Sequence, residues 1–502
     1  MTDVPRLRVL GRNAILNLAG HIAPIAGALV AIPFLVRGLG PERFGLLSLA
    51  WVLVGYFSLF DLGVGRALTR AVAEDTGTPA ETALPGLIRR SLVLMALLGV
   101  GAGAAMFFLA PWLCVSVLRI SDAMQSEATL VLRILSVCLP FVTITAGLRG
   151  VLEARQRFGW VNAIRAPIGL LTFLAPAGIQ AIMPGLVPIA VVLAVLRVIA
   201  AWAHWIPCAQ LYPGLARAQR TTQRGVASLL GFGAWLTVSN VIGPLMVYFD
   251  RFVIGAMLTV SAVAYYTAPY EVVTRLWLIP AALTAVVFPS LSAYLKESSA
   301  RAKDVYRWSL KFVFFATYPL VLLLTLLAPD WLGLWLGADY AQRSYQVVQF
   351  LAAGVLANSL AYVPYTLLQS AGRADLTAKL HLAELPFYFL LLMWLVGTSG
   401  ISGAALAWAL RSTLDAVLLF MLAGSRIPGR PPLFGRTQAL AAGLLIVLLP
   451  VSWMATTAAV RWPLLFAVLL LFLSLSGFVL LSPAERKALR HPWLLKDNLG
   501  NR

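Results

Sequence analysis

Charged residues are scarce in this sequence. Asp, Glu, Lys and Arg make up 12% of its 502 residues, whereas hydrophobic residues make up 60%. Roughly 25% of the residues of a soluble domain are charged, so the composition excludes one large water-soluble core. Acidic residues are the scarcest charged type, with 20 Asp and Glu against 39 Lys and Arg and a net charge of +19.

Cysteines and common catalytic motifs are equally sparse. The three cysteines, Cys114, Cys138 and Cys208, lie far apart in apolar segments, which fits buried small side chains and gives no metal-ligand spacing. No GxxxxGK[ST] loop is present, so nucleotide hydrolysis by a P-loop is excluded. The predicted outer loops, such as "SDAMQSE" (121–127), are short and carry no paired acids. A polytopic glycosyltransferase or ligase is therefore disfavoured, and no metal or cofactor is expected.

Long apolar runs are abundant. Segments such as "SLVLMALLGVGAGAAMFFLAPWL" (91–113) match the roughly 20 apolar residues that a helix needs to cross a bilayer. Membrane-spanning strands would alternate every second residue instead. The predicted fold class is an all-α polytopic membrane protein with about fourteen transmembrane helices. The predicted spans are 13–36, 45–68, 91–113, 128–150, 160–183, 186–210, 229–255, 262–293, 309–336, 346–368, 376–397, 401–423, 437–457 and 461–481.

The basic residues fall mostly on one side of the predicted membrane. With the N-terminus in the cytoplasm, most of the 39 Lys and Arg lie in inner loops and at the two ends of the chain. This distribution follows the positive-inside rule and places both termini in the cytoplasm. We interpret the excess positive charge as a consequence of this topology and of contact with anionic lipid headgroups. No nucleic-acid partner is expected.

A charged turn between two apolar runs occurs twice. "RGVLEARQRFGWVNAI" (149–164) and "TLLQSAGRADLTAKL" (366–380) place Arg157 and Arg373 216 positions apart. Breaks after the first and seventh spans, at Leu39 and Leu258, are 219 positions apart. Two matches at nearly the same spacing predict a repeat of six spans, and we interpret the turns themselves as structural.

The repeat predicts the organisation of the chain. Because six spans is an even number, the two halves run parallel, related by an axis along the membrane normal. Two parallel six-helix lobes would then enclose a V-shaped central cavity that opens alternately to either side. The predicted parts are an N-terminal lobe (1–224), a C-terminal lobe (225–425), and a linker with helices 13 and 14 and a cytoplasmic tail (426–502).

Three stretches resemble a known family. "NLAGHIAPIAGALVAIPFLVRGLGPERFGLLSLAWVLVGYFSLFDLGVGRALTR" (17–70) is similar to the opening of the polysaccharide transporter family of lipid-linked oligosaccharide flippases. The shared pattern is a first span, "LG" followed by an acidic residue and "FG", and a second span ending in "DLGVGRALTR". "YFDRFVIGAMLTVSAVAYYTAPYEV" (248–272) and "LLQSAGRADLTAK" (367–379) resemble later passages of the same family. The resemblance extends over essentially the whole chain and implies the multidrug/oligosaccharidyl-lipid/polysaccharide exporter superfamily.

This resemblance implies a transporter that does no covalent chemistry. Such a flippase moves an undecaprenyl-diphosphate-linked oligosaccharide from the cytoplasmic to the periplasmic leaflet of the bacterial inner membrane by alternating access. The oligosaccharide would be a repeat unit of O-antigen, capsule or exopolysaccharide. Coupling to an H⁺ or Na⁺ gradient is expected by the same resemblance. The implied partners are the lipid-linked oligosaccharide, a polysaccharide polymerase and a chain-length regulator.

Arg197 and Arg165 are the first candidates for binding the substrate. An ionisable side chain at depth in a membrane costs about 2.5–3.5 kcal/mol on insertion scales and is a functional candidate facing a cavity. Neither arginine has a carboxylate three or four positions away on its own helix. Each therefore needs a partner from another helix, such as Asp61, or from the ligand. A diphosphate is a suitable ligand, because guanidinium forms forked, charge-assisted hydrogen bonds with phosphate oxygens.

Four further charges inside spans form two pairs at helical spacing. Glu271 and Arg275 are four residues apart, as are Arg411 and Asp415. Residues at this spacing share a helix face and can neutralise each other. Either a self-neutralised pair between the lobes or a role in binding substrate, with Arg275 and Arg411 as the ligands, is consistent with this pattern.

The other candidates stand alone or next to each other. Asp250 and Arg251 are adjacent and are predicted to point apart, with an anchoring role favoured and substrate binding by Arg251 as the alternative. Asp61 has no basic residue three or four positions away and could pair with an arginine or bind a coupling cation. His21 lies in mid-span and could titrate near neutral pH, although a packing role is favoured.

Two other transporter classes are weighed against the flippase. A cation-coupled multidrug antiporter of the same superfamily would resemble a first span with an acidic residue, and residues 13–36 contain none. Unpaired arginines also favour an anionic ligand. A major-facilitator carrier is disfavoured because residues 71–90 lack its acidic and basic loop signature.

Overall fold

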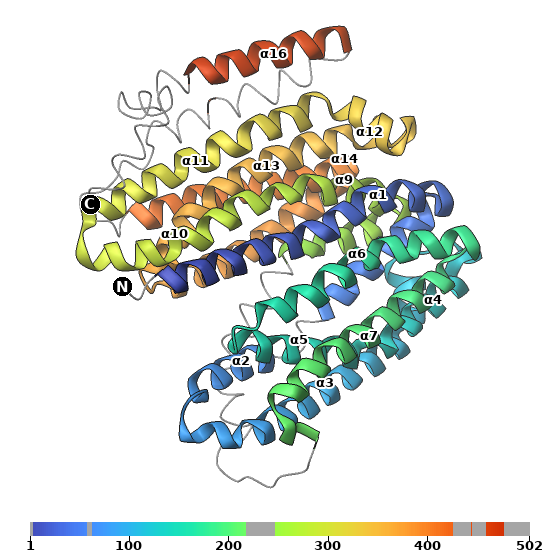
Figure 1. Cartoon of the computed structure of the whole chain (residues 1–502). Helices are drawn as coiled ribbons and strands as arrows, with labels where there is room; N and C mark the ends of the chain where they lie inside the picture. The colour runs from blue at the N-terminus through green and yellow to red at the C-terminus, as the bar shows by residue number, and fades with distance from the viewer. Residues whose placement is uncertain (1–3, 58–62, 217–245, 425–442, 444–457, 476–502) are drawn as a thin grey trace. The chain divides into compact units, whose positions relative to one another are not determined.

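In the computed structural model, every regular element of the described residues is a helix (Figure 1). The structure describes residues 4–57, 63–216, 246–424, 443 and 458–475. A helix satisfies its backbone hydrogen-bonding groups within its own segment, which the hydrocarbon region of a bilayer requires. Within these residues, eight helices are long and apolar enough to cross a membrane. The predicted all-α polytopic class is therefore confirmed.

The chain divides into two compact units. The first holds residues 1–271 with 389–404, and the second holds residues 272–388 with 405–502. In the first unit, α1 packs along α6, while α5 contacts α2, α3 and α7. A buried apolar cluster lies among α2, α3, α5 and α7. The helices of this unit are α1 (Val4–Phe57), α2 (Val64–Asp75), α3 (Leu84–Trp112), α4 (Asp122–Val137), α5 (Leu139–Ala154), α6 (Phe158–Ile182), α7 (Leu186–Leu211), residues 246–257 and most of α9 (Val260–Val273).

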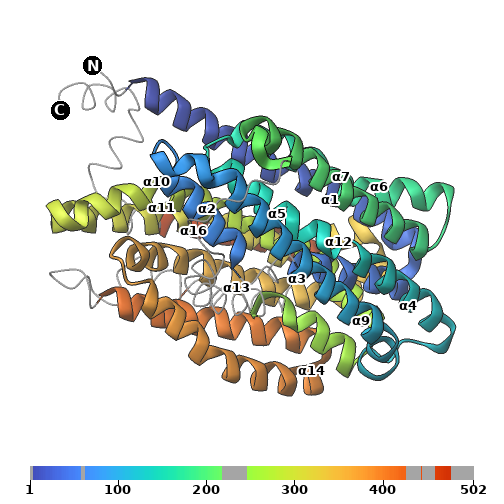
Figure 2. The same ribbon diagram turned by 90° about the horizontal axis from the view of Figure 1, so that it is seen from below.

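The second unit is built around α13. This helix contacts α10, α11 and α12, and it is the most buried of the candidate spans. Two views show α11 and α13 running side by side (Figures 1 and 2). The helices of this unit are η4 (Thr274–Trp277), α10 (Leu278–Glu297), α11 (Ser299–Leu326), α12 (Ala328–Leu336), α13 (Ala338–Ser370), most of α14 (Ala374–Gly424) and α16 (Ala458–Leu475).

Most predicted spans correspond to described helices. α1 contains the first predicted span and the start of the second, joined across a non-helical Gly40, and α14 contains the eleventh and twelfth, joined across Gly400. The long eighth span is α9, η4 and α10 in succession, with a 3₁₀ turn at η4 between the two α-helices. The thirteenth predicted span (437–457) lies outside the described residues except for residue 443.

The first charged turn ends α5 in a specific hydrogen-bonded arrangement. The Arg157 N–H donates to the Leu152 carbonyl oxygen (2.9 Å), and the Gln156 N–H donates to the Glu153 carbonyl oxygen (2.9 Å). These two bonds, with a left-handed residue at the first position after the helix, define a Schellman motif. The left-handed residue is Gln156, with a φ of 54°.

The second charged turn repeats this arrangement after α13. The Arg373 N–H donates to the Leu368 carbonyl oxygen (2.9 Å), and the Gly372 N–H donates to the Gln369 carbonyl oxygen (3.0 Å). Each donor and acceptor lies 216 positions after its counterpart in the first turn. The left-handed residue is Gly372, with a φ of 74°. This local geometry agrees with the predicted repeat and with a structural role of the turns.

The predicted lobe boundaries stay predictions. The first, at 224/225, falls in residues 217–245, and the second, at 425/426, falls in residues 425–442. Both stretches lie outside the described residues. The two compact units differ from the predicted lobes, because residues 246–271 belong to the first unit and residues 389–404 join it from α14.

The two turns differ only slightly in backbone but carry different residues at the left-handed position, which allows a reciprocal test. A non-glycine residue in this conformation costs roughly 1–2 kcal/mol. We expect Gly372→Gln to lower the thermal unfolding temperature of the detergent-purified protein. Gln156→Gly should leave it unchanged or raise it, because relief of the strained backbone offsets the greater freedom of glycine in the unfolded chain.

The control for this test is Gly101→Ala in α3, where an added Cβ meets no atom within 4 Å. This substitution should not lower the unfolding temperature. An unchanged or higher unfolding temperature for Gly372→Gln would show that the turn after α13 does not depend on glycine.

Candidate functional site

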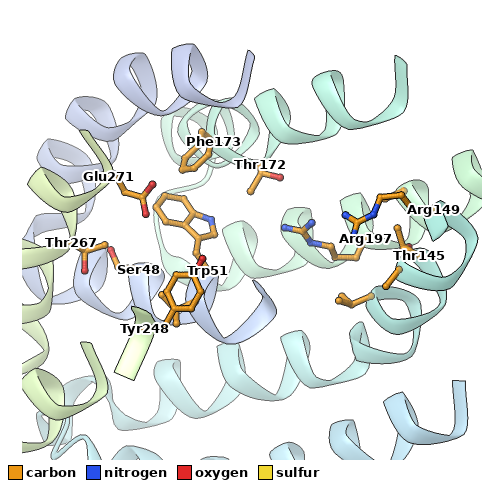
Figure 3. A pocket seen from close by; sticks show the side chains of 14 residues that line it. Ser48, Trp51, Thr145, Arg149, Thr172, Phe173, Arg197, Tyr248, Thr267 and Glu271 are labelled. Carbon is orange, nitrogen blue, oxygen red and sulfur yellow. The ribbon is translucent and has the colours of Figure 1, made fainter. Parts of the chain in front are cut away.

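The first unit contains a cavity of about 350 Å³. Its walls come from α1, α5, α6, α7, the helix of residues 246–257 and α9. Polar and aromatic side chains are gathered at this cavity (Figure 3). The lining residues are Ser48, Trp51, Val52, Val142, Thr145, Ala146, Arg149, Thr172, Phe173, Arg197, Ala200, Tyr248, Thr267 and Glu271.

One end of the cavity is basic. Arg197 on α7 and Arg149 on α5 lie together there, as Figure 3 shows. Arg149 Nε is 3.6 Å from Glu153 Oε1 on the same helix, and both side chains are nearly half exposed. Arg197 forms no ion pair among the described residues, and its buried Nε has no hydrogen-bond partner. The basic end therefore offers one guanidinium that has no counterion in the described part of the chain, and a second one whose ion pair is long and exposed.

The other end of the cavity is aromatic and carries an acid. In Figure 3, Trp51, Phe173, Tyr248 and Glu271 lie away from the two arginines. The ring centroids of Trp51 and Phe173 are 5.0 Å apart, a spacing typical of favourable aromatic pairs. The cavity thus presents positive charge at one end, and flat apolar rings with hydrogen-bonding groups at the other.

Arg251 contacts the cavity wall from outside. It is fully buried, with Nη1 3.6 Å from Asp250 Oδ1 and Nη2 3.9 Å from Glu271 Oε1. Its guanidinium carbon lies 4.2 Å from the centroid of the Tyr270 ring, and the Tyr266 hydroxyl donates to Asp250 Oδ2 (2.5 Å). The prediction that Asp250 and Arg251 point apart is wrong. Their side chains converge because the Asp250 carboxylate also accepts the backbone N–H of Arg251 (2.7 Å).

The second unit contains a separate cluster of charges on α14. Arg411 Nη1 is 3.8 Å from Glu384 Oε2, and His381 Nε2 is 3.4 Å from Asp415 Oδ1. The prediction that Arg411 and Asp415 neutralise each other is wrong. Each instead contacts a residue from the start of α14, because the break at Gly400 folds the two halves of this helix together.

The remaining predicted site residues lie elsewhere. Arg165 on α6 does not line the cavity and interacts with the charges of Arg149 and Glu153. Arg275 lies in η4. Asp61 falls outside the described residues, and His21 is part of α1 but its side chain is not described. The assigned roles of these residues, including the Glu271–Arg275 pair, stay predictions.

Several site residues escaped the sequence analysis. Arg149 was assigned to a structural turn, although it lines the cavity one helical turn before that turn begins. Glu384 and His381 were not singled out, yet an acid and a histidine at a spacing of three within an apolar run are a recognisable signal. Trp51 and Thr267 carry no such signal, since isolated Trp and Thr residues are common in membrane helices.

No metal site is indicated in the part of the chain that the structure describes. No group of three or more His, Cys, Asp or Glu side chains there is arranged to hold a metal ion. The three cysteines are free, buried and separate from one another. This arrangement can bind a ligand in which an anionic group lies next to a polar, ring-shaped group.

The sequence matches a protein family and a curated relative. Residues 10–295 match the family model described as "Polysaccharide biosynthesis protein". A protein of Shigella flexneri named as an O-antigen transporter is 33% identical over 416 residues, covering 81% of this chain and 96% of the relative. The family match covers more than half of the chain, and the relative aligns along almost its entire length.

Solved structures share the fold at low sequence identity. The lipid II flippase MurJ in an inward closed conformation superposes with a TM-score of 0.71 and 12% identity, covering 92% of this chain and 98% of MurJ. An inward-facing multidrug resistance transporter of the MATE family gives a TM-score of 0.64 and 17% identity, covering 82% and 98%. The chain therefore belongs to the polysaccharide biosynthesis protein family and is a multi-pass membrane transporter, not an enzyme.

Proposed function

We propose that the protein is a flippase for an undecaprenyl-diphosphate-linked oligosaccharide, and that Arg197 binds the diphosphate. The observation that carries the proposal is the Arg197 guanidinium, which lines a cavity and has no carboxylate partner among the described residues. The family and the O-antigen transporter of Shigella flexneri support a glycan substrate. The MurJ fold supports transport of a lipid-linked molecule.

The chemistry of the cavity fits a diphosphate better than other anions. A guanidinium presents two parallel N–H groups to phosphate oxygens in forked hydrogen bonds. Two arginines at one end of the cavity supply two such groups for two phosphates, and Glu271 at the far end leaves the basic end positive. Binding of the diphosphate would neutralise a buried charge that has no counterion among the described residues, and this gain supplies affinity.

The proposal also covers the membrane in which the protein resides and the direction in which it moves its substrate. The protein would reside in the bacterial inner membrane with both termini in the cytoplasm, where the positive-inside distribution of its 39 Lys and Arg places them. The oligosaccharide would be loaded at the cytoplasmic leaflet and released at the periplasmic leaflet by alternating access. Its product would be a repeat unit of O-antigen, capsule or exopolysaccharide for a polymerase and a chain-length regulator.

Substitution of Arg197 tests this proposal. Arg197→Ala should abolish export of the surface glycan in cells whose own flippase gene is deleted, without lowering the abundance of the protein in membranes. Loss of a charged hydrogen bond of about 1.5–3 kcal/mol weakens binding roughly 10- to 150-fold. Arg165→Ala should have a smaller effect, because Arg165 does not line the cavity.

The matched control is Arg133→Ala on α4. Arg133 also has a buried Nε without a hydrogen-bond partner, but it lies outside the cavity and over the Phe107 ring. Export by this variant should match that of the unmodified protein. Normal glycan export by Arg197→Ala at normal abundance would remove Arg197 from the mechanism.

We further propose that a coupling cation, H⁺ or Na⁺, acts through the charge cluster on α14. Glu384 and Asp415 are 4% exposed, and among the described residues one permanent cation, Arg411, lies with them and His381. Both carboxylate oxygens of Glu384 lack hydrogen-bond partners there. When His381 is neutral, two buried carboxylates facing one guanidinium leave an excess negative charge in an apolar setting, which a bound cation would neutralise.

Gradient dependence in proteoliposomes tests the coupling. In Glu384→Gln and Asp415→Asn, transport should no longer respond to an imposed pH or Na⁺ gradient, because the excess negative charge is removed. Asp375→Asn serves as the control, since Asp375 begins the same helix but is exposed and bound to Arg373 (2.9 Å). Unchanged gradient dependence in both cluster variants would contradict the assignment.

A cation-coupled multidrug antiporter is the second candidate, favoured by the shared fold of the MATE-family transporter. The basic end of the cavity disfavours a cationic drug, because Arg149 and Arg197 repel it. Cells lacking the protein should therefore retain a cationic dye no more than parent cells do, while their surface glycan is lost. Increased dye retention with normal surface glycan would favour the antiporter instead.

A further inference from the structure

Four Ser and Thr side chains line the cavity, and the hydroxyl of one of them differs from the others. Ser48, Thr145 and Thr172 each donate to the carbonyl oxygen four residues earlier on their own helix, at 2.9, 2.6 and 2.8 Å. Thr267 on α9 is 2% exposed, and its Oγ1 has no hydrogen-bond partner among the described residues. A buried hydroxyl without a partner is unfavourable, so among these four Ser and Thr residues Thr267 is the one whose hydroxyl is available to a ligand.

Trp51 on α1 has a second unpartnered group at the cavity. Its indole Nε1 is buried without a hydrogen-bond partner, and this group can only donate. The ring is held in place by Phe173, at a centroid distance of 5.0 Å, and by Phe44, at 6.1 Å. Trp51 therefore presents a fixed N–H donor that no described residue satisfies and that an acceptor atom of a ligand can satisfy.

The packing of α1 against α9 brings these two groups to the same cavity. A Cβ atom at Gly45 of α1 would collide with the carbonyl oxygen of Val260 at the start of α9, so glycine permits this close approach. Trp51 and Thr267 lie about two turns further along the two helices. In Figure 3 both lie on the side of the cavity away from Arg149 and Arg197.

The size of the cavity limits what can sit between these groups. Its volume of about 350 Å³ is at the lower end of the range for ligand pockets, roughly 300–1,000 Å³. This space suits a diphosphate and one sugar ring and is too small to enclose an oligosaccharide. The remaining sugars of a longer glycan would extend out of the cavity.

We infer that Trp51 and Thr267 bind the sugar attached directly to the diphosphate and that they make the transporter selective for that sugar. The inference rests on the proposed function, because it takes the diphosphate to be at the basic end. The indole N–H and the Thr267 hydroxyl donate to oxygen atoms of the sugar, either ring hydroxyls or an acetamido carbonyl. The aromatic rings of Trp51, Phe173 and Tyr248 pack against its apolar face.

Selectivity follows from the two fixed groups. A site built to hydrogen-bond a polar group rejects an analogue that lacks it, because the buried protein groups are then left unpaired. A lipid diphosphate without a sugar leaves Trp51 Nε1 and Thr267 Oγ1 unsatisfied. The sugar-bearing molecule should therefore bind more tightly, although both carry the same diphosphate.

Binding of short-chain analogues to the purified full-length protein tests the inference. The probes are farnesyl diphosphate and four farnesyl diphosphates that carry N-acetylglucosamine, N-acetylgalactosamine, glucose or galactose. Calorimetry in detergent should show that at least one sugar-bearing probe binds about tenfold or more tightly than farnesyl diphosphate. Trp51→Phe and Thr267→Val should each reduce this advantage about tenfold, the effect of one lost hydrogen bond, and leave the affinity for farnesyl diphosphate unchanged.

Thr325→Val on α11 is the matched control, because the buried Thr325 hydroxyl is already bonded within its own helix and Thr325 does not line the cavity. It should change the affinity for neither kind of probe. The inference is wrong if none of the four sugars improves binding, or if Thr267→Val and Trp51→Phe keep the full advantage. The proposed function fails separately, if farnesyl diphosphate binding does not depend on Arg197.

Discussion

The guanidinium of Arg197 is held within an apolar helix without a counterion from the described protein. Charged side chains at such positions are costly and are found where they face a cavity or a functional partner. In this chain the neighbours of Arg197 on α7 are apolar, and the arginine lines the cavity next to Arg149. The proposed ligand would neutralise this charge.

The rest of the first unit can be understood from this constraint. One end of the cavity is basic, and the other end is lined by aromatic rings and hydrogen-bonding groups. Glu271, the acid that lines the cavity, is contacted by the fully buried Arg251, which lies between it and Asp250. The negative charge is thereby held at a distance from Arg197. A molecule with an anionic group joined to a sugar matches this division of charge and polarity.

The comparison with solved transporters separates fold from function. MurJ and the MATE-family transporter share this fold at 12% and 17% identity, and one is a lipid II flippase whereas the other is a multidrug transporter. A fold of this kind therefore serves transporters with different functions, and function depends on the side chains of the site. In the proposed function, the two arginines are the feature of this chain that would favour an anion.

Much of the fold follows from local signals in the sequence. Run length and hydropathy predict the helices, and Gly40 and Gly400 mark breaks within α1 and α14. The two charged turns were also recognisable, because a Schellman motif depends on a few consecutive residues. Signals of this kind need no knowledge of which helices become neighbours.

The site was predictable only in part, because much of it depends on which helices become neighbours. Arg197 was identified because the absence of a carboxylate on its own helix can be read directly from the sequence. The ion-pair partners of Arg411 and Asp415 were not predicted. These partners, Glu384 and His381, come close only because α14 folds back at Gly400. Trp51 and Thr267 become notable only when packing removes all their hydrogen-bond partners.

The position of the diphosphate is the most direct test of this account. A cryo-electron microscopy map of the protein in a lipid nanodisc with bound farnesyl diphosphate would locate its two phosphates. The account predicts phosphate oxygens at hydrogen-bonding distance, about 2.7–2.9 Å, from the Arg197 guanidinium, with Arg149 beside them. Phosphate density elsewhere in the protein, with Arg197 bound to a carboxylate of the chain, would contradict it.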